Sequence, residues 1–182
     1  PVDFPAFSAG DLDHSFAIPA ADLRRLIDKT RFAISTEETR YYLNGIHLHA
    51  VEDGERALRA VATDGHRLAR VEVDLPAGAE GMPGIIVPRK AVTELRKLLD
   101  DAEDDVAVAL SDVKVRFTVD GAVLSSKLID GTFPDYQRVI PEGNDKVMSV
   151  HGPSFAEAVD RVSTIASDKS RAIKLMIETG KL

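Results

Sequence analysis

Residues 85–99 read IIVPRKAVTELRKLL, a short apolar run, a proline and then the most regular amphipathic pattern in the chain. The run Ile85–Val87 predicts a strand that ends at Pro88, a residue suited to the position just before a first helical turn. Beyond it, apolar residues recur every three or four positions, with the basic residues on the opposite side. This stretch therefore predicts a strand followed directly by an amphipathic helix.

The same order of elements starts near residue 14 and again near residue 147. Ile18-Pro19 aligns without gaps with Val87-Pro88, and Leu23 then aligns with Val92. The third copy aligns with the first through Phe155 and its helical neighbours. A period of roughly 65–70 residues is too long for most solenoid repeats and predicts duplicated subdomains.

Around these helices the sequence alternates in the manner of short strands. Asp64-Gly65 separates two of them and predicts a hairpin with a two-residue turn, because Asp-Gly tolerates the positive φ that such turns need. The fold class expected is α+β, with antiparallel sheets and helices on one side. Helices are expected at 20–34, 89–99 and 155–165, and strands at 14–18, 40–50, 56–63, 66–73, 85–87, 106–110, 113–119, 122–128, 147–150 and 171–177.

Composition excludes several classes of protein. The chain has 182 residues, 44% of them hydrophobic, and a formal net charge of −7. It has no cysteine, which excludes disulfide scaffolds, thiolate metal sites and cysteine nucleophiles. We find no apolar run near the ~20 residues of a membrane helix and no signal-peptide pattern. A cytoplasmic protein without membrane association is the expectation.

The basic residues are unevenly distributed. The spans 20–34 and 89–99 hold 8 of the 23 Lys and Arg residues but only 3 of the 30 acidic ones. One interpretation is an ordinary solvated helix face. The other is a face that meets a polyanion such as DNA through its phosphates, without sequence specificity.

Catalytic patterns are scarce. His47 and His49 alternate along an expected strand and could offer two metal ligands, or they could be plain strand histidines. His66 follows the Asp64-Gly65 turn, where hairpin chemistry accounts for it. No P-loop, dinucleotide fingerprint or nucleophile elbow is present, so we expect no enzyme, no catalytic residue, no metal and no cofactor.

Five motifs in order resemble a known family. They are Tyr41-Tyr42-Leu43-Asn44-Gly45, Ala62-Thr63-Asp64-Gly65-His66-Arg67-Leu68, Val87-Pro88-Arg89-Lys90, Ser126-Lys127-Leu128 and Phe133-Pro134-Asp135-Tyr136. This set resembles the bacterial DNA polymerase III beta subunit, the sliding clamp, over nearly the whole chain. The resemblance implies a homodimeric ring of three similar domains per subunit, with helices lining the hole. It also implies a non-catalytic processivity factor for DNA replication, although the family can be classed with nucleotidyltransferases.

Registered on that family, the chain divides into three parts. Residues 1–13 resemble the linker from a first domain, 14–138 the middle domain, and 139–182 the connector and the start of a third. The family closes its ring by packing the first domain of one subunit against the third of the other. We therefore do not expect this chain alone to close a ring.

The resemblance also implies a hydrophobic pocket that docks short peptides of the replicative polymerase, the clamp loader and repair proteins. Apolar residues would form a cup for leucine and aromatic anchors, with arginines at its rim. Ordinary core packing is the alternative for each apolar residue. Family pockets also use residues of the extreme C-terminus that this chain lacks. Its affinity for peptides should therefore be reduced. The matching positions are Leu43, Thr63, Gly65, His66, Arg67, Leu68, Pro134, Arg138 and Val139.

Five residues are candidates for the surface that faces duplex DNA. The resemblance points to Tyr41, Tyr42 and Lys90, and helix position and charge add Arg24 and Arg89. On a regular strand the two tyrosines would point to opposite faces, and one would then belong to the core.

Two other functions remain open at this point. One is a peptide-binding β module without a DNA role. The other, which we favour less, is a metal-dependent hydrolase that uses His47, His49 and neighbouring acids.

Overall fold

The computed structural model describes residues 12–52, 54, 56–165 and 173–178. By its internal contacts the chain divides into two units, Pro1–Pro134 and Asp135–Leu182.

The first unit contains the same order of elements twice, a strand, a helix and three further strands. The first copy is β1 (His14–Pro19), α1 (Ala20–Asp28), β2 (Gly45–Val51), β3 (Ala57–Thr63) and β4 (Leu68–Asp74). The second copy is β5 (Ile85–Pro88), α2 (Arg89–Leu98), β6 (Asp105–Leu110), β7 (Lys114–Val119) and β8 (Ala122–Lys127).

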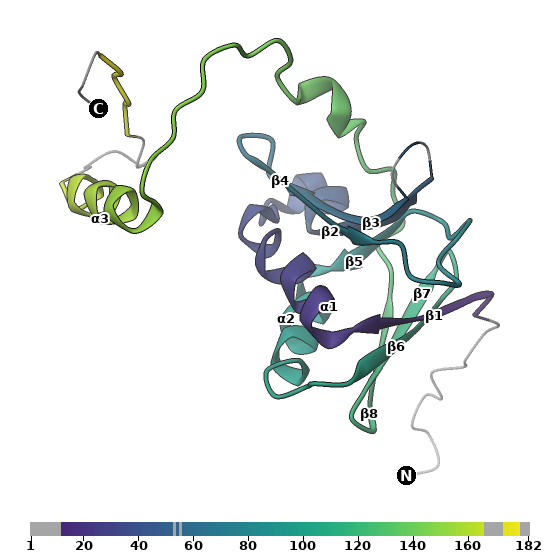
Figure 1. The fold of residues 1–182 in the computed structure, drawn as a ribbon. Coiled ribbons are helices and arrows are strands. Elements are labelled where there is room, and N and C mark those ends of the chain that lie inside the picture. Colours follow the sequence, from purple (N-terminus) through teal and green to yellow (C-terminus); the bar gives the residue numbers. More distant parts are fainter. Residues whose placement is uncertain (1–11, 53, 55, 166–172, 179–182) are drawn as a thin grey trace. The chain divides into compact units, whose positions relative to one another are not determined.

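These strands form two four-stranded antiparallel sheets of equivalent order, β4-β3-β2-β5 and β8-β7-β6-β1 (Figure 1). In each sheet, the strand that precedes one helix pairs with the strand that follows the other helix. Pro19 at the end of β1 faces Asp105 at the start of β6, and Pro88 at the end of β5 faces Gly45 at the start of β2. The two copies thus exchange their first strands, which confirms the expected duplication and the α+β class.

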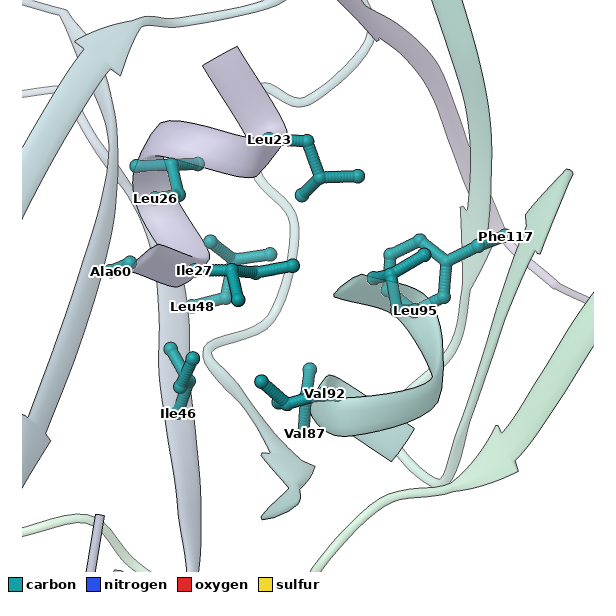
Figure 2. Close-up of a pocket in the computed structure, with 10 residues that line it drawn as sticks. All are labelled: Leu23, Leu26, Ile27, Ile46, Leu48, Ala60, Val87, Val92, Leu95 and Phe117. Atoms are coloured by element: carbon teal, nitrogen blue, oxygen red, sulfur yellow. The ribbon is translucent and has the colours of Figure 1, made fainter. Parts of the chain in front are cut away.

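The helices α1 and α2 lie side by side (Figure 1). Their apolar residues are buried in the core. Leu23, Leu26 and Leu95 are at most 4% exposed, and Phe117 of β7 is 1% exposed. Figure 2 shows these side chains, together with Ile46 and Val87 of the other sheet, around a wholly apolar cavity of about 20 Å³. Burying each such side chain contributes roughly 1.5–3 kcal/mol, so the expected helix stripes hold the two sheets together.

The first helix is shorter than the expected 20–34, since α1 ends at Asp28. The hydroxyl of Thr30 donates to the Leu26 carbonyl oxygen at 2.6 Å, and the Thr30 amide donates to Ile27 at 3.1 Å. The tighter i to i−3 pattern continues in a 3₁₀ turn, η1 (Arg31–Ala33). This local back-bonding, common for threonine, ends the α-helix early.

The expected strand at 40–50 is wrong in its first half. Residues Glu38–Leu43 form a 3₁₀ segment, η2, and β2 begins only at Gly45. The pairing explains the difference, because Gly45 faces Pro88, the last residue of β5. Residues before Gly45 therefore have no strand on that side to continue the ladder.

The hairpin between β3 and β4 has a longer loop than its Asp-Gly sequence predicts. Thr63 pairs with Leu68, which leaves four residues, Asp64 to Arg67, in the loop. A two-residue turn with positive φ at both positions occurs instead at Asp120 and Gly121, with φ of 45° and 81°, between β7 and β8.

The second unit contains η3 (Tyr136–Val139) and α3 (Gly152–Ser163), which confirms the third expected helix. Neither 147–150 nor 173–177 is a strand, and 171–172 lie outside the described residues. A strand needs a neighbour to satisfy its backbone, and the described part of this unit forms no sheet. Of the helices described in both units, none has the length and apolar character that crossing a membrane takes.

Candidate functional site

The loop between β3 and β4 carries most of the expected peptide-pocket residues and is built around Asp64. The Asp64 carboxylate accepts the amides of His66 at 2.9 Å and Arg67 at 3.0 Å, and the Arg67 Nε at 2.9 Å. The Thr63 hydroxyl donates to the Arg67 carbonyl at 2.7 Å and accepts the Gly65 amide at 3.1 Å. These contacts give the loop one defined shape and leave the side chain of His66 exposed.

Electrostatics keep this loop in its observed form. Burial acts to raise the pKa of Asp64, but hydrogen bonds from the Arg67 and His66 amides and from the Arg67 guanidinium outweigh it. The pKa of Asp64 is therefore below its ordinary value. A charged acceptor at the centre strengthens each of the bonds that shape the loop.

Two neighbours of the loop are not among the expected site residues. Arg40 of η2 lies so close to Gly65, at φ +88°, that a Cβ on this glycine would be 2.6 Å from the arginine Nη1. The Arg67 guanidinium carbon lies 6.0 Å from the centre of the Phe32 ring, which is 57% exposed. Leu43, 4% exposed, is the last residue of the same η2. The loop, η1 and η2 thus meet, and an exposed aromatic ring lies beside the loop.

The segment that ends in Pro134 lies against η2 and β2. Gly131 is in contact with Tyr42, since a Cβ built on it would be 3.1 Å from the tyrosine Cβ. The ring of Phe133 stacks on His47 of β2, with 4.7 Å between centroids. Pro134 itself is exposed.

Arg138 and Val139 belong to the second unit, where both lie on η3. Val139 is 68% exposed, and Arg138 forms an exposed ion pair with Asp135 at 2.8 Å. Both side chains are accessible to a ligand.

The expected DNA-facing residues fall into two groups. Arg89 and Lys90 are exposed in the first turn of α2 and form no ion pair with any residue that the structure describes. Arg24 differs, because its guanidinium donates to the carbonyl oxygens of Leu99 at 3.0 Å and Ala102 at 2.8 Å. Arg24 joins the two helices, whereas Arg89 and Lys90 remain available to an anion.

Tyr41 and Tyr42 lie in η2, so the alternation of a strand does not apply to them. Tyr41 is 54% exposed and Tyr42 is half-buried, and their rings meet edge to face at 5.7 Å. Only Tyr41 presents most of its surface to solvent.

Two further cations, Arg25 on α1 and Lys29 at the C-cap directly after it, are not among the expected DNA-facing residues. Arg25 and Lys29 are exposed, lie four positions apart, and have no ion pair within the described ranges. Their position opposite the buried Leu23, Leu26 and Ile27 is the signal that could have identified them.

His47 and His49 do not form a metal centre with other residues of the described chain, where no group of three or more His, Asp or Glu could hold an ion. Burial, followed by the charge of His49, lowers the pKa of His47 to about 4. Burial also lowers the pKa of His49. The metal-dependent hydrolase therefore has no support in this structure.

Comparison with known families gives two matches in sequence order. Residues 17–135 match the family of the DNA polymerase III beta subunit, central domain. Residues 137–182 match the C-terminal domain of the same subunit.

Individual relatives are similar to the chain over nearly its whole length. The beta sliding clamp of Caulobacter vibrioides is 55% identical over 181 residues, 99% of this chain and 49% of the relative. That of Pseudomonas aeruginosa is 41% identical over 180 residues, 99% of this chain and 48% of the relative. The chain thus spans about half the length of the curated relatives it matches.

Solved structures agree with this similarity. The crystal structure of the DnaN sliding clamp from Bartonella birtlesii bound to griselimycin is 56% identical and has a TM-score of 0.92. The match covers 97% of this chain and 48% of that one. A sliding clamp from Pseudomonas aeruginosa is 41% identical, has a TM-score of 0.81, and covers 89% of this chain and 44% of its own.

Proposed function

Because the chain belongs to the DNA polymerase III beta subunit family, we propose that it is part of a bacterial sliding clamp. The complete clamp encircles duplex DNA and docks replication and repair proteins through a peptide pocket. It confers processivity on a polymerase by topology and performs no catalysis of its own. Residues 14–138 are its middle domain, 139–182 begin the third, and 1–13 are the linker from the first.

The observation that carries the DNA role is the pair of adjacent helices with unpaired cations. The exposed cations are Arg25 on α1, Lys29 directly after it, and Arg89 and Lys90 on α2, while the chain as a whole has a net charge of −7. A basic helix layer on an acidic body confines the attraction for phosphates to one face. Such a surface favours a weak, mobile hold on DNA without base contacts.

The peptide role is supported by the shape of the loop that Asp64 organises. It presents His66 and Arg67 to solvent beside the exposed Phe32 ring. Leu68 is half-buried and supplies apolar surface at the end of the loop. A half-buried leucine and an exposed aromatic ring beside basic side chains suit a short peptide with leucine and aromatic anchors.

The partners proposed are duplex DNA, a replicative polymerase, a clamp loader and repair proteins, in the cytoplasm. A homodimeric ring is proposed only for a full-length clamp with all three domains. The DNA-facing set proposed is Arg24, Tyr41, Tyr42, Arg89 and Lys90. We add Arg25 and Lys29 because they are exposed, and prefer them to Arg24 because its guanidinium is bound to backbone carbonyls.

A peptide titration tests the pocket directly. In the full-length clamp, His66→Ala and Arg138→Ala should each weaken binding of a fluorescein-labelled pentapeptide that ends in Leu-Phe. His151→Ala, an exposed histidine ahead of α3, is the matched control and should bind as the unmodified protein does. Unchanged affinity in both pocket variants would remove these residues from the site.

The alternative of a peptide-binding β module predicts a different pair of results. Such a protein would bind the pentapeptide but would not remain on closed circular DNA at any salt concentration. Retention on circular DNA together with peptide binding favours the clamp.

A further inference from the structure

Three aromatic rings from two distant segments form a continuous stack in the first unit. The His47 ring stacks on Phe133, at 4.7 Å and an interplanar angle of 10°, and on His49, at 4.8 Å and 24°. His47 and His49 are neighbours on one face of β2, whereas Phe133 lies beyond β8, immediately before Pro134. We call these three side chains the ring stack.

His47 is the fixed member of the ring stack. It lies on β2, between β3 and β5, and its Nδ1 is 3.2 Å from the carbonyl oxygen of Ile85, to which it can only donate. Gly84 leaves room for the ring, because a Cβ there would be 2.9 Å from the His47 Cε1. Since the pKa of His47 is lowered to about 4, its ring is neutral at physiological pH. A neutral, planar ring that is held by its strand and by the Ile85 carbonyl offers a flat surface to a second ring.

Phe133, stacked on His47, restrains the position of the next residue, Pro134. The chain leaves β8 with its backbone bonded to the sheets, from the Leu128 amide to Val113 at 2.9 Å and from the Ile129 amide to Ile86 at 3.0 Å. Four residues later, the ring of Phe133 returns to β2, the strand that follows η2 and Leu43. β2 thus begins two residues after Leu43 and also contacts the residue just before Pro134; Leu43 and Pro134 are two apolar residues of the proposed pocket.

We propose that the ring stack positions the peptide pocket, with His47 as a positioning residue that holds Pro134 in place through Phe133 without touching the peptide. This inference rests on the proposed function of the pocket. Without the stack, Pro134 would have to be ordered when the peptide binds, and the cost of ordering would appear as lost affinity. The occupant is the same short peptide with leucine and aromatic anchors.

Three variants of the full-length clamp separate positioning from folding. His47→Ala removes the surface under Phe133, whereas His47→Phe restores a planar ring without the histidine nitrogens. His14→Ala, on β1, removes a histidine far from the stack in the sequence and on the other sheet. The readouts are the affinity for the Leu-Phe pentapeptide and amide hydrogen exchange at residues 131–133.

Affinity should fall about three- to tenfold in His47→Ala, with faster exchange at 131–133, and should return to within about twofold in His47→Phe. Melting temperature alone does not distinguish these two variants from a general packing defect, but rescue of affinity by the planar ring does. His14→Ala should bind like the unmodified clamp.

Two results would overturn the inference, and they are distinguishable. If the unmodified clamp binds the peptide and His47→Ala binds it equally well, the positioning role is wrong and the proposed pocket stands. If the unmodified clamp does not bind the peptide at all, the pocket itself is wrong, and the positioning role is lost with it.

Discussion

The guanidinium of Arg24 on α1 donates through Nε to the carbonyl oxygen of Leu99, 3.0 Å away, at the end of α2. The last carbonyls of a helix have no partner within the helix, and they carry the negative end of its dipole. A half-buried cation from the neighbouring helix satisfies them. Together with the 2.8 Å bond between Asp28 and Arg96, this contact locks α1 to α2.

Arg24→Ala should therefore act on stability more than on DNA binding. Loss of its charged hydrogen bonds should reduce the free energy of unfolding by about 2 kcal/mol. Urea unfolding of this variant and of Arg25→Ala, which removes an exposed cation from the same helix, measures the difference. Equal stability of the two variants would contradict the bridging role.

Arg89→Ala and Lys90→Ala should affect DNA binding more than stability. Each removes an exposed cation. The plot of log affinity for a short duplex against log salt concentration should therefore become less steep, its negative slope shrinking by about 0.9. The control is Arg116→Ala, since Arg116 lies on the outer face of β7, opposite Val115 and Phe117. Fluorescence titrations at several salt concentrations measure the slopes, and a change for Arg116 as large as for Lys90 would refute the assignment.

Two glycines with similar backbone angles offer a matched test of the loop. Gly65 and Gly121 have φ of +88° and +81°, but only at Gly65 would a Cβ meet another group, Arg40. Both alanine variants should lose about 1 kcal/mol of stability from backbone strain. Only Gly65→Ala should also displace the loop and weaken binding of the pentapeptide. Similar peptide affinity in the two variants would argue against the loop as part of the pocket.

The ring stack also predicts a pH dependence of stability. Burial lowers the pKa of His47 from 6.5 to about 4, and the pKa of His49, which faces Arg59 and Glu72, is lowered as well. Between these pH values the unfolded chain binds more protons than the folded one. The free energy of unfolding should therefore fall as pH decreases from about 6.5 toward 4, and this contribution should level off below.

Urea unfolding at pH 7 and pH 5 measures this effect. Asp28 does not interfere at these pH values, because the hydrogen bond from Arg96 lowers its pKa further below its ordinary value. His47→Phe should lose less stability between the two pH values than the unmodified protein. An equal loss would show that His47 is not the group responsible.

The duplicated framework of the fold could be predicted from sequence because its signals are local. Pro19 and Pro88 each mark a strand that ends where a helix begins, and the apolar stripes of both helices are regular. The exchange of first strands between the copies is a long-range pairing that no local pattern contains.

The errors in the predicted elements have the same origin. Residues at 40–43 have strand-like side chains, but their ladder ends where Pro88 faces Gly45. The Asp64 loop depends on hydrogen bonds of its carboxylate, and only the Asp120-Gly121 turn follows the simple Asp-Gly rule.

For the candidate site, residue type was easier to predict than side-chain environment. Arg24 and Arg25 are adjacent and identical in chemistry, yet one binds backbone carbonyls and the other is exposed. The carbonyls of Leu99 and Ala102 lie more than seventy residues away, so this difference appears only in the folded chain. Phe32 and Arg40 were missed because their contacts with the Asp64 loop are also tertiary.

A complete clamp should hold DNA by encircling it. The most direct measurement loads the full-length clamp on nicked circular DNA at moderate salt and then cuts the circle with a restriction enzyme. A ring should remain on the circle and leave the linear product within the time of the digest. Equal retention on circular and linear DNA, or release from both with the same salt dependence, would contradict this account.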